Sequence, residues 1–305
     1  MISDNSETRS FADKLSNAAA DIILRSSDGT DFPSHKWILA KASDATDPHV
    51  IIPFTENAAS LELLLSYCYP RSMHPEPSFN SLEDVKDALS IATKYQVDVM
   101  REGIKTQLAA FTAGHPERVY ALAWLYEMPD LALSAARETL HQPFLEGPEV
   151  PEFFDIPAIA LHRLQQYQRT CITQVTHGLG SSVPVTWITV LSIRLQPAVP
   201  TTACSCGECV IDMLTGSPVH PGEIRAESIR AWWWGYVLRA VEALRESPHS
   251  STVARHELVY PSLVDAGKCL SCSTGRFVEI MSFTAQRLEK EVERIISEVP
   301  LKLPF

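Results

Sequence analysis

The alternation of apolar and polar residues near the N-terminus predicts a β-hairpin followed by a helix. Ile22 and Leu24 share one face of an extended segment, and residues 27–30, Ser-Asp-Gly-Thr, have the composition of a turn. A short return strand at residues 31–32 comes next, and residues 37–39, Trp-Ile-Leu, begin a helical apolar pattern. The local pattern therefore favours a hairpin that leads directly into a helix.

Most of the remaining chain has apolar residues three and four positions apart, which is typical of amphipathic helices with one buried face. Leu61, Leu64 and Cys68 mark such a face, and Cys68 is expected there as a small buried hydrophobic residue. Ser81 and the acidic Asp84 have the spacing of a helix cap. The predicted elements are a strand at 50–54 and helices at 58–69, 81–95, 100–113, 116–126, 129–140, 156–179, 227–246 and 277–299.

Changes in composition divide the chain into segments. Residues 143–157 contain four prolines, the clearest interruption of the helical patterns, and residues 181–203 have no clean period. The first 16 residues are polar and offer few apolar side chains for docking. The predicted organisation is a flexible tail at 1–16, an α/β domain at 17–114, a helical extension at 115–147, a helix and connector at 148–203, and a cysteine-containing helical domain at 204–305.

The predicted hairpin and the helix after it carry a spaced string, Ala-Asp-aliphatic and then Phe-x-x-His-Lys-x-x-Leu-x-x-x-Ser. Its members are Ala20, Asp21, Ile22, Phe32, His35, Lys36, Leu39 and Ser43. This string resembles the opening of the BTB/POZ domain, especially in the BTB-domain proteins abundant in mushroom-forming (basidiomycete) fungi, and the similarity extends more loosely to about residue 140. The resemblance implies a protein-protein interaction module, used as a scaffold or adaptor, with a cullin-type ubiquitin ligase as a partner in some relatives.

The chain departs from the BTB pattern immediately after Ser43. The family has a further helix at this point, whereas only a handful of residues separate Ser43 from the apolar run that begins at Val50. We therefore expect a BTB/POZ-like domain at 17–114 that is abbreviated after Ser43. Because the missing helix belongs to the family's dimer and partner surface, its absence weakens the expectation of a homodimer.

Composition and charge narrow the classes of function. With 305 residues, of which 45% are hydrophobic, the chain is long enough to bury one or two cores. The net charge is −11, and residues 200–305 hold 11 Lys and Arg against 13 Asp and Glu. Neither part has the basic excess needed for phosphate contacts, which disfavours nucleic acid as a partner. No apolar run reaches membrane-spanning length and the N-terminus is polar, so we expect no membrane partner and a cytoplasmic or nuclear location.

Two cysteine clusters in the last third carry the main candidate chemistry. The first reads Cys204-Ser-Cys206-Gly-Glu-Cys209 and the second reads Cys269-Leu-Ser-Cys272. Each contains a C-x2-C step, which lets two thiolates approach one tetrahedral ion from a tight turn. The sequence therefore predicts a structural zinc site on Cys206, Cys209, Cys269 and Cys272, with Cys204 as an alternative to Cys206. Such a site would clamp the ends of the C-terminal domain.

Several alternatives to this zinc site stay open. The two pairs are separated by about sixty residues, more than the roughly 15–20 of a compact zinc ribbon. Reduced cysteines without metal and a redox C-x2-C pair are the other interpretations. His220, His249 and His256 are further candidates for the fourth ligand. A site closed by four sulfurs would be structural, because a catalytic zinc keeps an open position.

Three consecutive tryptophans, Trp232 to Trp234, are a candidate stacking platform for a ligand. Successive helical residues point about 100° apart, so we expect one tryptophan to enter the core and the others to cover flanking grooves. The sequence contains none of the common catalytic motifs: no protease zinc motif, no Walker lysine, no nucleophile elbow and no dinucleotide fingerprint.

These observations predict an α+β fold class: a small BTB-like sheet with surrounding helices, followed by a mostly α-helical C-terminal domain that a zinc site of four cysteines clamps. The predicted function is a non-enzymatic protein-protein interaction module. The alternative is a transcription-associated regulator whose cysteine-rich C-terminal region contacts nucleic acid.

Overall fold

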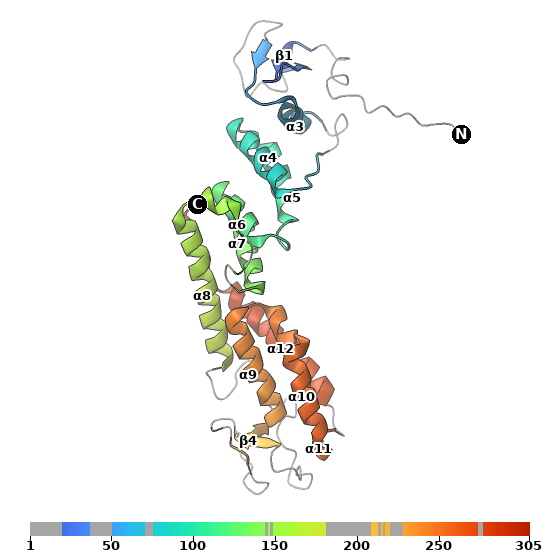
Figure 1. The fold of residues 1–305 in the computed structure, drawn as a ribbon, viewed down its shortest axis with the longest axis vertical. Helices are drawn as coiled ribbons and strands as arrows, with labels where there is room; N and C mark the ends of the chain where they lie inside the picture. The colour runs from blue at the N-terminus through green and yellow to red at the C-terminus, as the bar shows by residue number, and fades with distance from the viewer. Residues whose placement is uncertain are drawn as a thin grey trace, which may run out of the picture. The chain divides into compact units, whose positions relative to one another are not determined.

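The chain forms two compact units, an N-terminal unit of Met1–His115 and a C-terminal unit of Pro116–Phe305. The computed structural model describes residues 20–36, 51–70, 76–143, 146, 149–180, 209–212, 215, 217–219, 228–273 and 277–305 (Figure 1). The expected flexible tail, the helical pattern at 37–39 and the shortened connection after Ser43 lie outside the described residues. The fold is mixed α+β and mostly helical, as the sequence predicts.

The N-terminal unit contains a three-stranded sheet in the order β2-β1-β3. Strand β1 (Ile22–Arg25) pairs antiparallel with β2 (Asp31–Ser34), which places Leu24 opposite Phe32. The two strands are joined by a turn in which Gly29 has a φ of +86°, a left-handed conformation that glycine adopts without a steric penalty. Strand β3 (Ile51–Pro53) pairs with β1 in parallel. The predicted hairpin and third strand are thus confirmed.

Three helices supply most of the buried apolar side chains of this unit. They are α3 (Ala58–Cys68), α4 (Leu82–Lys94) and α5 (Asp98–Ala109), and each contacts the other two. Leu61, Leu89 and Ile104 are fully buried, one from each helix. The Ser81 side chain accepts a hydrogen bond from the backbone N–H of Asp84 at 3.1 Å, so the predicted cap of α4 is confirmed. Cys68 is only partly buried.

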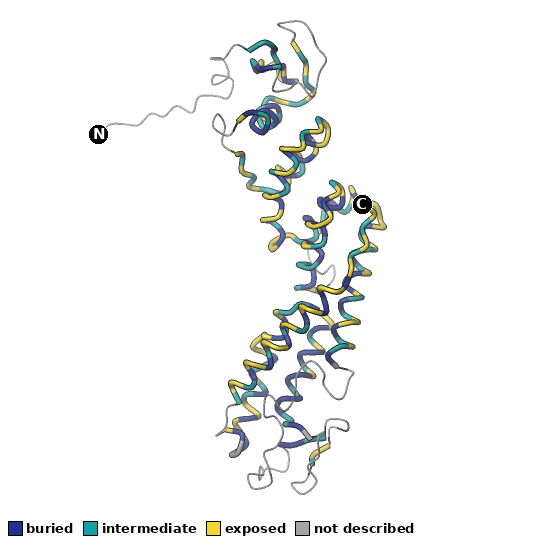
Figure 2. The backbone as a smooth tube through the Cα atoms, turned by 180° about the vertical axis from the view of Figure 1, so that it is seen from behind, coloured by how far each residue is buried: buried dark blue, intermediate teal, exposed yellow. Residues whose placement is uncertain are grey.

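The C-terminal unit is an assembly of helices with one short β-ribbon. Helices α8, α9, α10 and α12 lie side by side, and buried and exposed residues alternate along them (Figure 2). The elements are α6 (Pro116–Leu125), α7 (Pro129–Glu138), η1 (Thr139–His141), η2 (Pro151–Phe154), α8 (Ala158–Gly180), β4 (Val210–Asp212), β5 (Ser228–Arg230), α9 (Ala231–Glu246), η5 (Ser250–Ala254), α10 (His256–Lys268), α11 (Leu270–Ser273) and α12 (Phe277–Ser297).

The segments predicted separately at 115–147, 148–203 and 204–305 all contribute to this one unit. Helix α8 packs against α9 and α12, because its apolar stripe can be buried only by a neighbouring helix. The Tyr120 hydroxyl of α6 donates to the Ala160 carbonyl of α8 at 2.8 Å. Arg118 forms an ion pair with Glu152, whose side chain is almost fully buried.

The sequence analysis predicted no helix at the position of α10, in which Pro261 lies and removes one helical hydrogen bond. Contacts with α9 hold the helix on both sides of this proline. The Arg239 guanidinium of α9 donates to the Leu258 carbonyl at 3.2 Å and to the Ser262 hydroxyl. The Ser262 hydroxyl in turn donates to the Trp232 carbonyl. Tertiary packing therefore overrides a sequence signal that normally ends or kinks a helix.

The start of α9 and the burial of its tryptophans differ from the sequence prediction. The helix begins at Ala231, because residues 228–230 form strand β5, which pairs antiparallel with β4. Trp232, Trp233 and Trp234 are all buried, whereas the sequence predicted only one in the core. The prediction was wrong because α9 is contacted on several sides, by α8, α10, η5 and β5. Trp233 also donates from Nε1 to the Thr284 hydroxyl of α12 at 2.9 Å.

None of the helices in the described ranges has the length and apolar content needed to cross a membrane.

Removing the Trp233 side chain should destabilise the C-terminal unit strongly. Trp233→Ala leaves a cavity in the core and removes the hydrogen bond to Thr284, so we expect a loss of about 3–5 kcal/mol in unfolding free energy. Leu238→Ala on the same helix is the matched control, since Leu238 is 51% exposed and should cost less than about 1 kcal/mol. Denaturant unfolding followed by circular dichroism measures both, and equal losses would contradict the central position of Trp233.

A pair of stacked histidines joins the end of α7 to the segment after α9. The rings of His141 and His249 lie 3.4 Å apart between centroids. The His249 Nδ1 accepts a hydrogen bond from the backbone N–H of Ser251 at 3.2 Å, which caps η5. Burial lowers the pKa of His249, and the charge of His141 lowers it further, while the charges of Glu138 and Glu293 act in the opposite direction.

The unfolding free energy should therefore fall as the pH decreases below 6.5. The pKa of His249 is depressed in the folded state, so below its ordinary value of 6.5 the unfolded chain binds a proton more readily than the folded chain does. His249→Asn keeps a capping acceptor and removes the titration, and it should reduce this pH dependence. Thermal melts at several pH values test the expectation, with His162→Asn as an exposed histidine control. A pH dependence that is unchanged in the His249→Asn variant would show that other titratable side chains cause the fall in unfolding free energy.

Candidate metal centre

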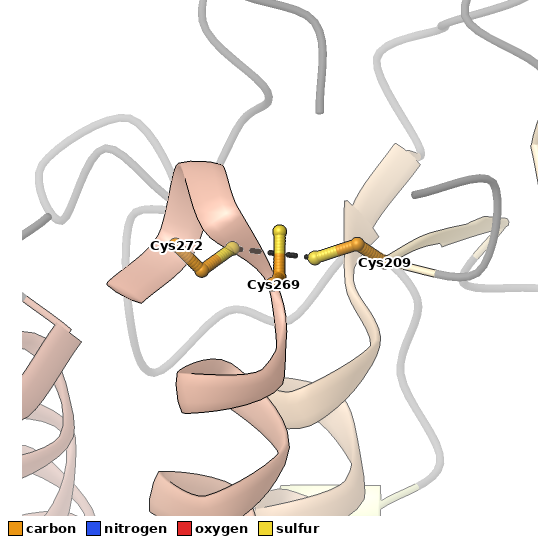
Figure 3. Close-up of side chains that lie close together, drawn as sticks. All are labelled: Cys209, Cys269 and Cys272. Atoms are coloured by element: carbon orange, nitrogen blue, oxygen red, sulfur yellow. Dashed lines mark hydrogen bonds between the residues drawn. The ribbon is translucent and has the colours of Figure 1, made fainter. Parts of the chain in front are cut away.

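Three buried cysteines from distant parts of the C-terminal unit meet at one end of α9 and α10. The Sγ atoms of Cys209, Cys269 and Cys272 all lie within 4.8 Å of one another, and those of Cys209 and Cys272 are 3.2 Å apart across 63 residues of sequence (Figure 3). Each of the three residues is at most 7% exposed. The structure therefore gathers three soft sulfur ligands in a protected position.

Cys209 is positioned by the β-ribbon. It directly precedes β4, and in the ribbon Val210 lies opposite Arg230. The backbone N–H of Ala231, the first residue of α9, donates to the Cys209 carbonyl at 3.0 Å. The ribbon thus fixes Cys209 beside the first turn of α9, although these residues are far apart in the chain.

Cys269 and Cys272 are positioned by a sharp turn between two helices. Helix α10 ends at Lys268, and the next residue, Cys269, has an extended backbone with φ −91° and ψ 120°. The short helix α11 then begins, and the backbone N–H of Ser273 donates to the Cys269 carbonyl at 2.8 Å. This turn brings the two thiols of the C-x2-C step to the same side.

Hydrogen-bond donors surround the sulfur atoms. Trp232 donates from its indole Nε1 to the Cys272 sulfur at 3.4 Å, and Arg230 donates from Nη1 to the Cys209 sulfur at 3.7 Å. The hydrogen bond with Cys209 lowers the pKa of Cys272 to about 5, although burial acts in the opposite direction. The indole N–H of Trp232 and the charge of Arg230 contribute to the same shift. The surroundings therefore stabilise the thiolate of Cys272, the form that binds metal.

The geometry fits a tetrahedral zinc ion. A zinc ion with Zn–S bonds of about 2.3 Å holds its sulfur ligands about 3.8 Å apart. The three sulfurs all lie within 4.8 Å of one another, close to this spacing. Thiolate ligands favour zinc over harder ions such as magnesium or calcium. Cys209, Cys269 and Cys272 would hold the ion, which would join the β-ribbon to the end of α10.

The structure brings together three of the four ligands predicted from sequence. Cys206, the alternative Cys204 and the histidine candidate His220 lie outside the described residues. His249 follows the C-terminal end of α9, and His256 begins α10 roughly 20 Å of helix away from Cys269. These two histidines therefore lie at the opposite end of the helices from the cluster, and the geometry excludes them as ligands.

The remaining described cysteines have a different environment. Cys171 is buried in α8 and Cys68 is half-buried in α3. Burial raises the pKa of both thiols, that of Cys171 to about 12. They are neutral packing residues, in contrast to the cluster.

No motif in the sequence indicates that Trp232 and Arg230 donate hydrogen bonds to the sulfurs. Both side chains reach the cluster only because β5 continues into α9 beside α11, an arrangement that no local pattern in the sequence encodes.

Comparison with protein-family models finds no family that matches the chain, and comparison with curated proteins finds no relative. The resemblance to the BTB/POZ domain therefore stays a prediction from the residues themselves.

Removing one sulfur should release the metal and destabilise the C-terminal unit. We expect Cys269→Ala to lower the zinc content from about one ion per chain to near zero, and a chelator to lower the melting temperature of the wild-type chain. Cys171→Ala is the matched control, because it removes a buried thiol outside the cluster and should retain zinc. Native mass spectrometry measures the number of zinc ions per chain, and a wild-type chain that binds no zinc would contradict the zinc site.

Proposed function

We propose that this protein is a non-enzymatic interaction protein, a BTB-like scaffold or adaptor with a C-terminal helical domain stabilised by structural zinc. The observation that carries the proposal is the structural role of the residue string that resembles the BTB opening. Each described member whose contacts are known helps to build the sheet or to attach it to the helices.

The side chains of this string act as fold determinants. Ile22 and Phe32 are buried in the hairpin. The Asp21 carboxylate accepts a hydrogen bond from the backbone N–H of Lys36 at 2.6 Å, which joins the start of β1 to the end of β2. The backbone N–H of His35 donates to the Tyr69 hydroxyl, and the two rings meet edge to face. These contacts attach the hairpin to the end of α3.

The order of elements also supports the proposal. A hairpin, a third strand parallel to the first, and a set of helices agree with the small sheet and surrounding helices that the resemblance implies. In this interpretation the N-terminal unit binds partner proteins, and a cullin-type ligase is the candidate partner. The zinc cluster has a structural role, since thiolate ligands closed around an ion stabilise a fold.

Binding to a cullin should depend on the N-terminal unit. We expect the full-length chain to bind the purified N-terminal region of a cullin with a Kd of about 1 μM or tighter, measured by calorimetry. Leu24→Asp places a charge in the buried hairpin and should abolish binding, whereas Trp233→Ala perturbs only the other unit and should retain it. Analytical ultracentrifugation of the same samples reports self-association.

Two results would contradict the proposal. A folded wild-type chain that binds no cullin and stays monomeric at every concentration would remove the adaptor role. Binding to duplex DNA that weakens steeply with salt, measured by fluorescence anisotropy, would favour the transcription-associated alternative.

A further inference from the structure

A cavity of about 400 Å³ lies between α9 and α10, beside the cysteine cluster. Helix α9 contributes Trp232, Gly235 and Arg239, while α10 contributes Asp265 and Lys268. Two cysteines of the cluster, Cys209 and Cys269, also line the cavity. This volume is within the range of small-molecule sites, roughly 300–1,000 Å³. Such sites combine an aromatic or apolar wall with a few polar groups in fixed positions, and both are present here.

Arg239 is the fixed polar group of this cavity. Its Nε and Nη2 atoms donate to the Leu258 carbonyl, and Nη2 also donates to the Ser262 hydroxyl. These bonds orient the guanidinium and leave Nη1 without a partner among the described residues. Gly235 keeps space beside this nitrogen, since a Cβ atom at that position would lie only 3.3 Å from Nη1.

Three charged side chains line the cavity, the cations Arg239 and Lys268 and the carboxylate Asp265. Lys268 and Asp265 form an ion pair at 2.8 Å and largely compensate each other. Burial lowers the pKa of the Arg239 guanidinium, which indicates that this cation is incompletely solvated, while the charge of Asp265 raises the same pKa. Arg230 and Trp232 donate hydrogen bonds to cluster sulfurs, whereas Arg239 donates to α10.

We infer that this cavity binds a small molecule carrying one oxyanion group, a carboxylate or a phosphate, which accepts a hydrogen bond from Nη1 of Arg239 while the rest of the ligand contacts Trp232. A guanidinium suits this role because its planar donors match carboxylate and phosphate oxygens. The site goes beyond the interaction function and the zinc clamp, and it requires neither of them to be correct.

Titration of the purified full-length chain with two probes tests the inference. Inorganic phosphate represents the phosphate class, and benzoate represents a carboxylate with a flat apolar body. Calorimetry, with NMR of isotopically labelled arginine side chains, should detect saturable binding of at least one probe at Arg239. Arg239→Gln should weaken that binding by about tenfold, the usual effect of losing a charge-assisted hydrogen bond.

A second variant keeps the test decisive if Arg239→Gln fails to fold. Gly235→Ala places a methyl group beside Nη1 and also improves helix propensity, so it should fold normally and still bind the probe several-fold more weakly. Arg245→Gln is the matched control, because Arg245 lies on the same helix, is 61% exposed and should leave binding unchanged.

The outcomes separate clearly. Binding that both cavity variants weaken and the control variant retains supports the site, and the preferred probe then identifies the oxyanion class. The inference is overturned if neither probe binds at about 10 mM, if Arg245→Gln weakens binding as much as Arg239→Gln, or if the cavity variants bind like wild type.

Discussion

Burial of three successive tryptophans on α9 is the constraint on which the C-terminal unit depends. Neighbouring helical side chains point about 100° apart, so burying Trp232, Trp233 and Trp234 together requires packing partners around more than half of the helix. Helix α8, helix α10 and η5 all contact α9, and α12 receives the indole hydrogen bond of Trp233 through Thr284. A helix with these requirements must be central, and α8, α10 and η5 are arranged around it.

The cysteine cluster and the neighbouring cavity both follow from the packing of α9 on α10. Trp232 begins α9 and donates to Cys272, while its carbonyl accepts from Ser262 of α10. Three residues further along α9, Gly235 leaves open the space that Arg239 borders. The clustered cysteines, their hydrogen-bond donors and the proposed anion site therefore use the same interface. A change that shifts α10 relative to α9 would disturb all three.

Local features of the structure could be predicted from the sequence, because they depend on neighbouring residues. The hairpin around Gly29, the cap at Ser81 and the helices that begin at Pro116 and Pro129 all follow from turn chemistry, capping and apolar period. The C-x2-C step at Cys269 and Cys272 is likewise a local spacing, and it correctly identified a thiol pair on one turn.

Tertiary structure decided what the local pattern could not encode. The meeting of Cys209 with Cys272 across 63 residues, the continuation of α10 through Pro261 and the burial of all three tryptophans each require a partner from a distant segment. In the N-terminal unit, the hydrogen bond from His35 to Tyr69 likewise joins the hairpin to the end of α3. The energies of such contacts outweigh local preference, as the hydrogen bonds from Arg239 to α10 illustrate. Thus the sequence alone determined most of the elements and the thiol class of the candidate metal ligands, and long-range packing determined which cysteines meet, which donors surround them and where the cavity opens.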